Sequence, residues 1–171
     1  MEEYNQDDID QLISCPKTIL EPPKRELKLV GADWRNDMVL AASSNDLKGR
    51  FPVFIRKNED FPENFSIGLR YVPRDDRGEI ILLRCNGPHG NYNGTEYDAR
   101  HPHWDYHVHK ATQGALAAGK RAESFAEKTS RYASFEEALP FFLAAINLAS
   151  SDIEKHFPQS SQAGLFGEHY E

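Results

Sequence analysis

Residues 65–72 read FSIGLRYV, and their large apolar side chains alternate with Ser66, Gly68 and Arg70. Successive side chains of a β-strand point to opposite faces, so this alternation predicts a strand with one buried and one polar face. Strands of this kind are typical of antiparallel sheets that pack on the core with a single face.

Four further segments have strand character, and short connections rich in turn-forming residues separate them. They are residues 26–30, 35–42, 51–57 and 79–85. Connections such as GAD, SSNDLKG and PRDDRG are too short for the crossovers of a parallel sheet, which take about a dozen residues or more. We therefore expect an antiparallel β-meander of five to six strands.

A helix is expected on each side of the meander. Residues 5–14 can be capped by Asn5 or Asp7. Their apolar side consists of Ile9, Leu12 and Ile13. The capping-box pattern from Ser134 to Glu137 predicts a second helix over residues 135–148. The expected fold class is α+β, with an N-terminal and a C-terminal helix packed on one face of the sheet.

The chain divides into three parts by composition. Residues 1–15 are an acidic, helical segment, residues 16–150 a single α+β domain, and residues 151–171 an acidic tail expected to be mobile. We expect residues 1–13 and 157–171 to add little to the core. Within the domain, the proline-broken stretch 15–25 reads as a linker and residues 111–128 as partly helical.

The net charge of −7 is concentrated at the ends of the chain. Residues 1–13 and 151–171 carry five and three net negative charges, which leaves one net positive charge on residues 14–150. A near-neutral body argues against a large basic nucleic-acid platform, but it leaves room for a site that binds one phosphate or a few nucleotides.

Several further observations bear on location. No apolar run approaches the roughly 20 residues that span a bilayer, so no membrane association is expected. The two cysteines, Cys15 and Cys85, form no disulfide framework, and the acidic N-terminus is unlike a signal peptide. We expect a cytoplasmic protein.

Residues 101–109 read HPHWDYHVH and hold four of the seven histidines. A strand here would carry five polar side chains on one face, those of His101, His103, Asp105, His107 and His109. The opposite face would be buried, with Pro102, Trp104, Tyr106 and Val108. Imidazole titrates near neutral pH and is the commonest metal ligand, so the histidines are candidate acid–base groups or metal ligands. The alternative is a solvated polar face without a chemical task.

The preceding segment, LRCNGPHG at residues 83–90, adds Arg84, Asn86 and His89 at the end of an apolar run. Arginine is a forked donor suited to phosphate, and asparagine both donates and accepts. The same residues also form a turn signal, whatever else they do. The candidate substrate-binding residues are His101, His103, Lys110 and Arg121. If a divalent metal is used, its expected ligands are His103, His107 and His109; otherwise no cofactor is expected.

These motifs support two resemblances. The run RNDM…FPVFIRKN…ENFSIGL…LLRCNGPHG…YHVHKAT resembles an uncharacterised bacterial and phage-borne domain family without an assigned function, over about residues 13–148. More distantly, LLRCNGPHG, a histidine-rich step and SFEEALPFFLAAI are similar to TumE-type toxins of toxin–antitoxin pairs, over about residues 79–148. The second resemblance implies a ribonuclease-like toxin. Its functional positions would be Arg84, Asn86, His89, His107 and His109.

Two functional hypotheses follow. The first is a ribonuclease-like toxin or phage-defence protein, with His107 and His109 as base and acid and Arg84 or Lys110 stabilising the phosphorane charge. The alternative is a non-enzymatic binding or inhibitor protein encoded by a phage or other mobile element, acting through its acidic ends or its sheet. The expected partners are accordingly RNA or a cognate protein.

Overall fold

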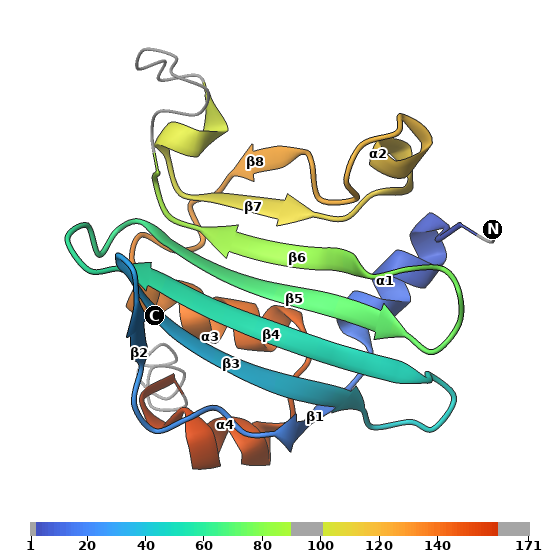
Figure 1. Ribbon diagram of the computed structural model, residues 1–171, viewed down its shortest axis with the longest axis horizontal. Helices are drawn as coiled ribbons and strands as arrows, with labels where there is room; N and C mark the ends of the chain where they lie inside the picture. Colours follow the sequence, from blue (N-terminus) through green and yellow to red (C-terminus); the bar gives the residue numbers. More distant parts are fainter. Residues whose placement is uncertain (1–2, 90–100, 161–171) are drawn as a thin grey trace, which may run out of the picture.

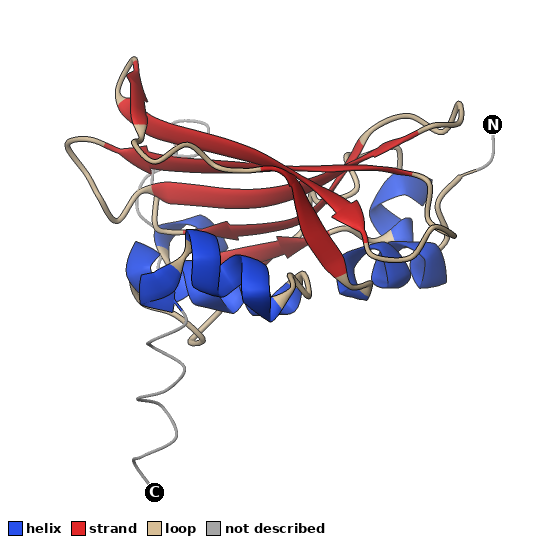
Figure 2. Cartoon of the chain, turned by 90° about the horizontal axis from the view of Figure 1, so that it is seen from below, coloured by secondary structure: helices blue, strands red, loops and turns tan. Residues whose placement is uncertain are grey.

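The computed structural model describes residues 3–89 and 101–160. They form one eight-stranded antiparallel sheet with helices on one of its faces, as Figures 1 and 2 show. The expected α+β class is thus confirmed, with helices near both ends of the meander. The sheet is larger than expected, because it has eight strands where the sequence predicted five to six.

The strands are β1 (Lys17–Glu21), β2 (Lys28–Val30), β3 (Asp33–Ala42), β4 (Gly49–Asn58), β5 (Phe65–Pro73), β6 (Ile80–Asn86), β7 (His107–Lys110) and β8 (Ala126–Lys128). The helices are α1 (Gln6–Ser14), α2 (Gln113–Ala117), α3 (Phe135–Ala145), α4 (Ser150–His156) and the short 3₁₀ helix η2 (Pro102–Trp104). From β3 to β8 each strand pairs with the next one along the chain, and β1 and β2 both pair with the outer edge of β3.

All five segments predicted as strands from their turn-bounded patterns are strands, namely β2 to β6. Two strands were missed. β1 lies in the stretch taken as a linker, and β8 lies where a partial helix was expected. Both are short edge strands that pair with a single neighbour, so tertiary pairing outweighs their weak local pattern.

The core lies between the inner face of the sheet and the helices. Alternate residues of the central strands, such as Val53, Ile67 and Leu69, are buried there against α1 and α3. Asn5 is the N-cap of α1, one of the two caps expected, and it forms a capping box with Asp8. Its residue Ile9 is fully buried, so the expectation that residues 1–13 add little to the core is wrong.

Lys17 is a fully buried lysine at the meeting point of two helix ends. Its ammonium donates to the carbonyls of Ile13 at 2.7 Å, Cys15 at 2.9 Å and Ile146 at 2.9 Å. The last turn of a helix leaves carbonyls without intrahelical partners, and this ammonium satisfies carbonyls from the ends of both α1 and α3. Burial lowers the pKa of Lys17.

The segment expected to be a mobile tail begins with a helix. α4 is tied to the sheet by Asp152, whose carboxylate accepts from the Ile19 backbone N–H at 2.9 Å. Phe157 packs against the core as a partly buried side chain. Residues 161–171 lie outside the described residues. Over 3–89 and 101–160, no helix is both long and apolar enough to cross a bilayer.

Candidate functional site

The outer face of the sheet carries the candidate residues in two rows of cross-strand neighbours. Residues paired across antiparallel strands place their side chains on the same face. The first row is Lys28, Arg35, Arg56, Ser66, Asn86, His107 and Lys128. The second row is Asp37, Phe54, Gly68, Arg84, His109 and Ala126. The register of β6 and β7 therefore brings four sequence-predicted residues together.

The expected strand over residues 101–109 is only half present. β7 begins at His107, and residues 102–104 form η2 instead. Pro102 explains the difference, because its fixed φ and missing N–H suit the first position of a helical turn. Trp104 is consequently half-buried and lies in η2, not on an apolar strand face.

The histidines of β7 are also more buried than expected. His107 and His109 are 0% and 2% exposed, whereas Tyr106 and Val108 on the opposite side are only partly buried. The chain that leads into β8 covers this end of the face, and the Glu123 carbonyl accepts from His109 Nδ1 at 2.9 Å. The alternative interpretation, a polar face exposed to solvent, is therefore wrong for these two residues.

Four imidazoles form what we call the histidine cluster: His89, His103, His107 and His109. The ring centroids of His103 and His107 are 4.7 Å apart, and those of His107 and His109 are 5.1 Å apart. His89 joins through the backbone, since its N–H donates to the His103 carbonyl at 3.1 Å. Its Nε2 also lies 2.7 Å from His103 Nδ1. His101 stacks on His103 at the border of the cluster.

Backbone carbonyls fix the tautomers of the two buried rings. His107 Nδ1 donates to the Asp105 carbonyl at 2.8 Å, as His109 Nδ1 does to that of Glu123. Both Nε2 atoms are then left as acceptors. Asn86 Nδ2 lies 3.3 Å from His107 Nε2, and the Ser66 hydroxyl donates to the Asn86 amide oxygen at 2.8 Å. His109 Nε2 is buried and has no hydrogen-bond partner among the described residues.

Burial keeps these imidazoles neutral. It lowers the pKa of His103 to about 4, of His107 to about 3 and of His109 to about 4. The other rings add to the effect in all three, and the Arg84 charge adds to it at His103 and His109. Burial also lowers the pKa of His89. At neutral pH the cluster therefore presents unprotonated nitrogens, the form that accepts a proton or binds a metal ion.

A pocket of about 390 Å³ opens beside the cluster. Its cationic lining residues are Arg56, Arg70, Arg84 and Arg121, and no carboxylate stands among the described residues that line it. Asn86 and His89 belong to the same lining. Arg84 is half-buried, its pKa is lowered by burial, and its Nε has no hydrogen-bond partner in the described structure. The pocket is suited to an anion such as a phosphate group.

Two of these arginines also have acidic partners outside the lining. Arg70 pairs with Glu79 at 2.8 Å, and Arg121 Nε lies 3.5 Å from the buried carboxylate of Glu123. These partners offset part of the positive charge of Arg70 and Arg121. Arg56 extends over the Phe54 ring, whose tip occupies the space that a side chain at Gly68 would need.

The structure places one candidate residue, Lys110, away from the other candidates. Lys110 lies on the inner side of β7 and pairs with Asp10 of α1 at 2.9 Å, so its charge is directed away from the histidine cluster. Cys85 is likewise buried on the inner face, where burial raises its thiol pKa to about 12. Arg56 and Arg70 were missed by sequence reasoning, although both stand at outward positions of predicted strands.

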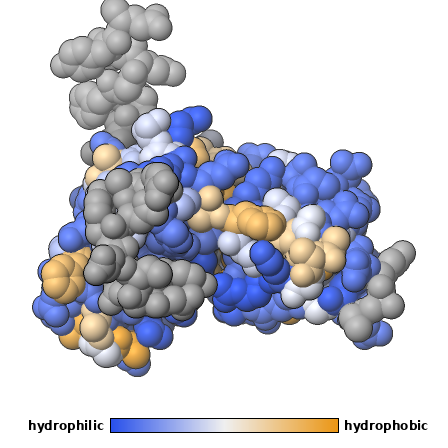
Figure 3. Space-filling view, turned by 90° about the horizontal axis from the view of Figure 1, so that it is seen from above, coloured by the Kyte–Doolittle hydropathy of each residue, from blue (hydrophilic) through white to orange (hydrophobic). Residues whose placement is uncertain are grey.

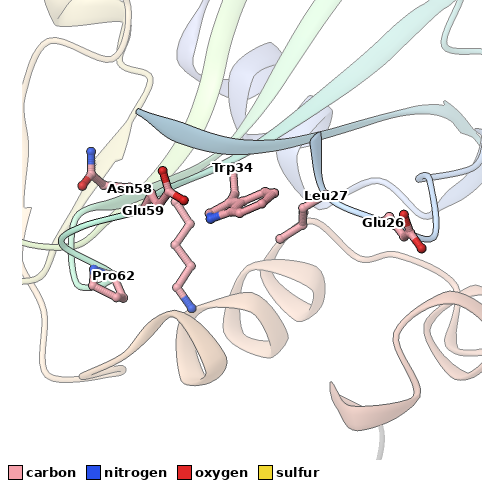
Figure 4. A pocket seen from close by; sticks show the side chains of 7 residues that line it. Glu26, Leu27, Trp34, Asn58, Glu59 and Pro62 are labelled. Atoms are coloured by element: carbon pink, nitrogen blue, oxygen red, sulfur yellow. The ribbon is translucent and has the colours of Figure 1, made fainter. Parts of the chain in front are cut away.

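A second cavity lies on the helix side of the sheet, at the same end as the arginine pocket. It measures about 520 Å³, is lined among others by Leu27, Trp34 and Lys57, and is shown in Figure 4. Lys57 pairs with Glu136 of α3 at 3.2 Å. Seen from the side of β8 and α2, most of the described surface is hydrophilic, with apolar residues in smaller groups (Figure 3).

Comparisons of the chain with family models, with curated proteins and with solved structures returned no match. The chemistry of the site is therefore inferred from its geometry.

Proposed function

We propose that the protein cleaves RNA as a ribonuclease-like toxin or defence protein, with the histidine cluster as its reaction centre. The observation that supports this proposal is that proton acceptors and an anion-binding pocket lie side by side on one face of the sheet. Neutral imidazoles that can accept protons lie directly beside a pocket lined by four arginines. Arg84 and His109 are cross-strand neighbours, so a phosphate held by Arg84 lies near a proton acceptor.

The roles follow from the hydrogen bonds. Arg84 and Arg121 bind the scissile phosphate and stabilise the charge that develops on it. His109 Nε2, which is a buried acceptor without a donor among the described residues, takes the proton of the attacking 2′-hydroxyl through one bridging water molecule. The 2′-oxygen bonds to phosphorus, the P–O5′ bond breaks, and the O5′ atom takes a proton. In the metal-free protein the N–H shared by His89 and His103 across 2.7 Å supplies that proton, and the proton taken by His109 later restores it through solvent.

The test uses a labelled single-stranded RNA and the purified protein, with and without added divalent cations. Cleavage should leave 2′,3′-cyclic phosphate ends and should stop at a 2′-deoxy position. His109→Ala should lower the rate by roughly 10²–10⁴-fold, the usual contribution of one acid–base group. Lys110→Ala is the matched control, because it removes a charge on the far face of the same strand. Absence of cleavage by the wild-type protein under both conditions would overturn the proposal.

A second candidate function is protein binding at the β1–β2 edge. Four of the six exposed large apolar residues in the described chain lie here: Leu20, Leu27, Leu29 and Val30. Exposed apolar residues on an edge strand mark a surface that can pair with a partner. A cognate protein that binds the wild type and His109→Ala equally, but not Leu29→Asp, would support this function.

A further inference from the structure

We propose that His89, His103 and His107 bind one divalent transition-metal ion. Each residue offers one ring nitrogen, and the three nitrogens lie within 4.8 Å of one another. They come from three separate places in the fold: the loop after β6, the helix η2 and the start of β7 (Figure 1). Three imidazoles that converge from separate elements resemble the histidine sets that bind catalytic zinc.

The ring nitrogens would have to move by about 0.6 Å at the closest pair and by up to about 1.5 Å at the widest to bind one ion. Nitrogens at 2.0–2.1 Å from one tetrahedral zinc ion lie about 3.3 Å apart. His89 Nε2 and His103 Nδ1 are 2.7 Å apart, so they would separate by roughly 0.6 Å when the ion comes between them and the proton there moves to the other nitrogen of its ring. Both side chains are half-buried and stand outside the β-strands, where such a movement is least hindered. The ion would also replace the 3.3 Å contact from Asn86 to His107 Nε2.

The surroundings have the features of a metal site. The Asp105 carbonyl orients His107 through Nδ1, which is the usual second contact of a metal-bound imidazole. His109 supplies an independent observation, because its Nε2 is buried, lies beside the three ligands and lacks a donor among the described residues. Buried acceptors without partners are uncommon in folded proteins. A water molecule on the ion would provide that donor.

The ligand set also indicates the kind of ion. Imidazole nitrogens favour zinc, cobalt, nickel and copper over magnesium and calcium, which prefer oxygen ligands. Three neutral ligands leave the charge of the ion uncompensated and a fourth coordination position open. That charge would add to the arginines of the neighbouring pocket and attract an anionic substrate. Only this catalytic use of the ion rests on the proposed function; binding of the ion does not.

Metal binding can be measured without RNA. Untagged protein is freed of metal with a chelator and titrated with Zn²⁺ and Co²⁺. We expect one ion per chain, a rise in the melting temperature and, with Co²⁺, the visible absorption of a tetrahedral site. His89→Ala should weaken binding at least about 100-fold, beyond the loss that follows from removing a second-shell contact. His156→Ala is the matched control, since it removes a histidine of α4 that is outside the cluster.

Circular dichroism of the metal-free variants checks that each is folded. His89 is half-buried in a loop, so its variant keeps the test valid even where a substitution at the buried His107 would unfold the chain. Failure of the wild type to bind either ion, or equal binding by His89→Ala, would overturn the metal site. Ion binding without RNA cleavage would instead overturn the proposed function alone, and cleavage that persists unchanged in chelator would remove the ion from its mechanism.

Discussion

The two faces of the sheet differ in polarity and in how well their buried polar groups are hydrogen-bonded. The inner face is apolar, is covered by α1 and α3 and contains the core. The outer face contains the buried side-chain atoms that lack hydrogen-bond partners in the described structure. They belong to Arg35, Arg70, Arg84 and His109 and to Glu123 beside them. Unpaired buried polar groups destabilise a fold, so their concentration on one face indicates that this face is arranged for binding and the other for stability.

Arg84→Met gives the largest expected effect and addresses this difference directly. Loss of the guanidinium should reduce RNA cleavage by roughly 10²–10³-fold, as for removal of a charge-stabilising donor. The free energy of unfolding should change by less than about 1 kcal/mol, because an apolar side chain replaces a buried group without a full set of partners. Cleavage rates and urea unfolding measure the two effects. A marked loss of stability with unchanged cleavage would reverse the assignment of the outer face.

Leu69→Ala tests the inner face with the opposite expectation. Leu69 is fully buried in the central strand β5, so the substitution should lower the free energy of unfolding by about 2–5 kcal/mol through lost burial and a cavity. At temperatures where the variant is folded, the cleavage rate should stay near that of the wild type. Urea denaturation gives the stability. A change below about 1 kcal/mol would show that the core lies elsewhere.

Lys17→Met sharpens the comparison, because Lys17 is a buried cation with a full set of acceptors. Its removal leaves three carbonyls at helix ends without their donor and should lower the free energy of unfolding by about 1–3 kcal/mol. Thermal unfolding compares it with Arg84→Met and with Lys155→Met on α4. If Lys17→Met and Arg84→Met lowered the free energy of unfolding equally, the number of hydrogen bonds that each cation makes would not explain its contribution to stability.

The smallest expected effect is that of pH on the metal-free protein. The folded-state pKa of His107 is about 3 and that of His109 about 4, both below the ordinary value of 6.5. Stability from keeping these rings neutral is therefore fully present above pH 6.5 and is lost as the pH falls towards 4. Between pH 6.5 and 6 the loss should be about 1 kcal/mol for the two rings together. Urea unfolding at several pH values measures it, and equal stability at pH 7 and pH 5 would contradict it.

Much of the fold could be read from the sequence because its strands repeat one pattern. The alternation over residues 65–72 predicts which side chains of β5 are buried, and the same rule places Arg70 on the outer face. Position parity also separates Lys110 from His107 and His109, since an even-numbered residue of β7 points to the opposite face. The short strands β1 and β8 escaped prediction because their pairing depends on neighbours distant in sequence.

The candidate site could be predicted only in its parts. Spacing identified His107 and His109 as neighbours on one face, and the end of an apolar run before a turn signal added Arg84, Asn86 and His89. The convergence of His89 with His103 depends on the register between β6 and β7 and on a backbone bond that closes the intervening loop. No local pattern encodes that closure. The prediction of a continuous histidine strand was wrong for a local reason, because Pro102 turns the chain before β7.

The contacts of Lys17 have a consequence for the order in which the protein is completed during synthesis. Its third acceptor, the Ile146 carbonyl, lies 129 residues further along the chain. A ribosome that adds about 5–20 residues per second reaches it roughly 6–26 seconds after Lys17 has been made. Throughout that interval the ammonium lacks its third acceptor, and the end of α1 lacks its link to the end of α3. The amino-terminal helix therefore reaches its final position only after α3 has been synthesised, and the nascent chain exposes its apolar inner face until then.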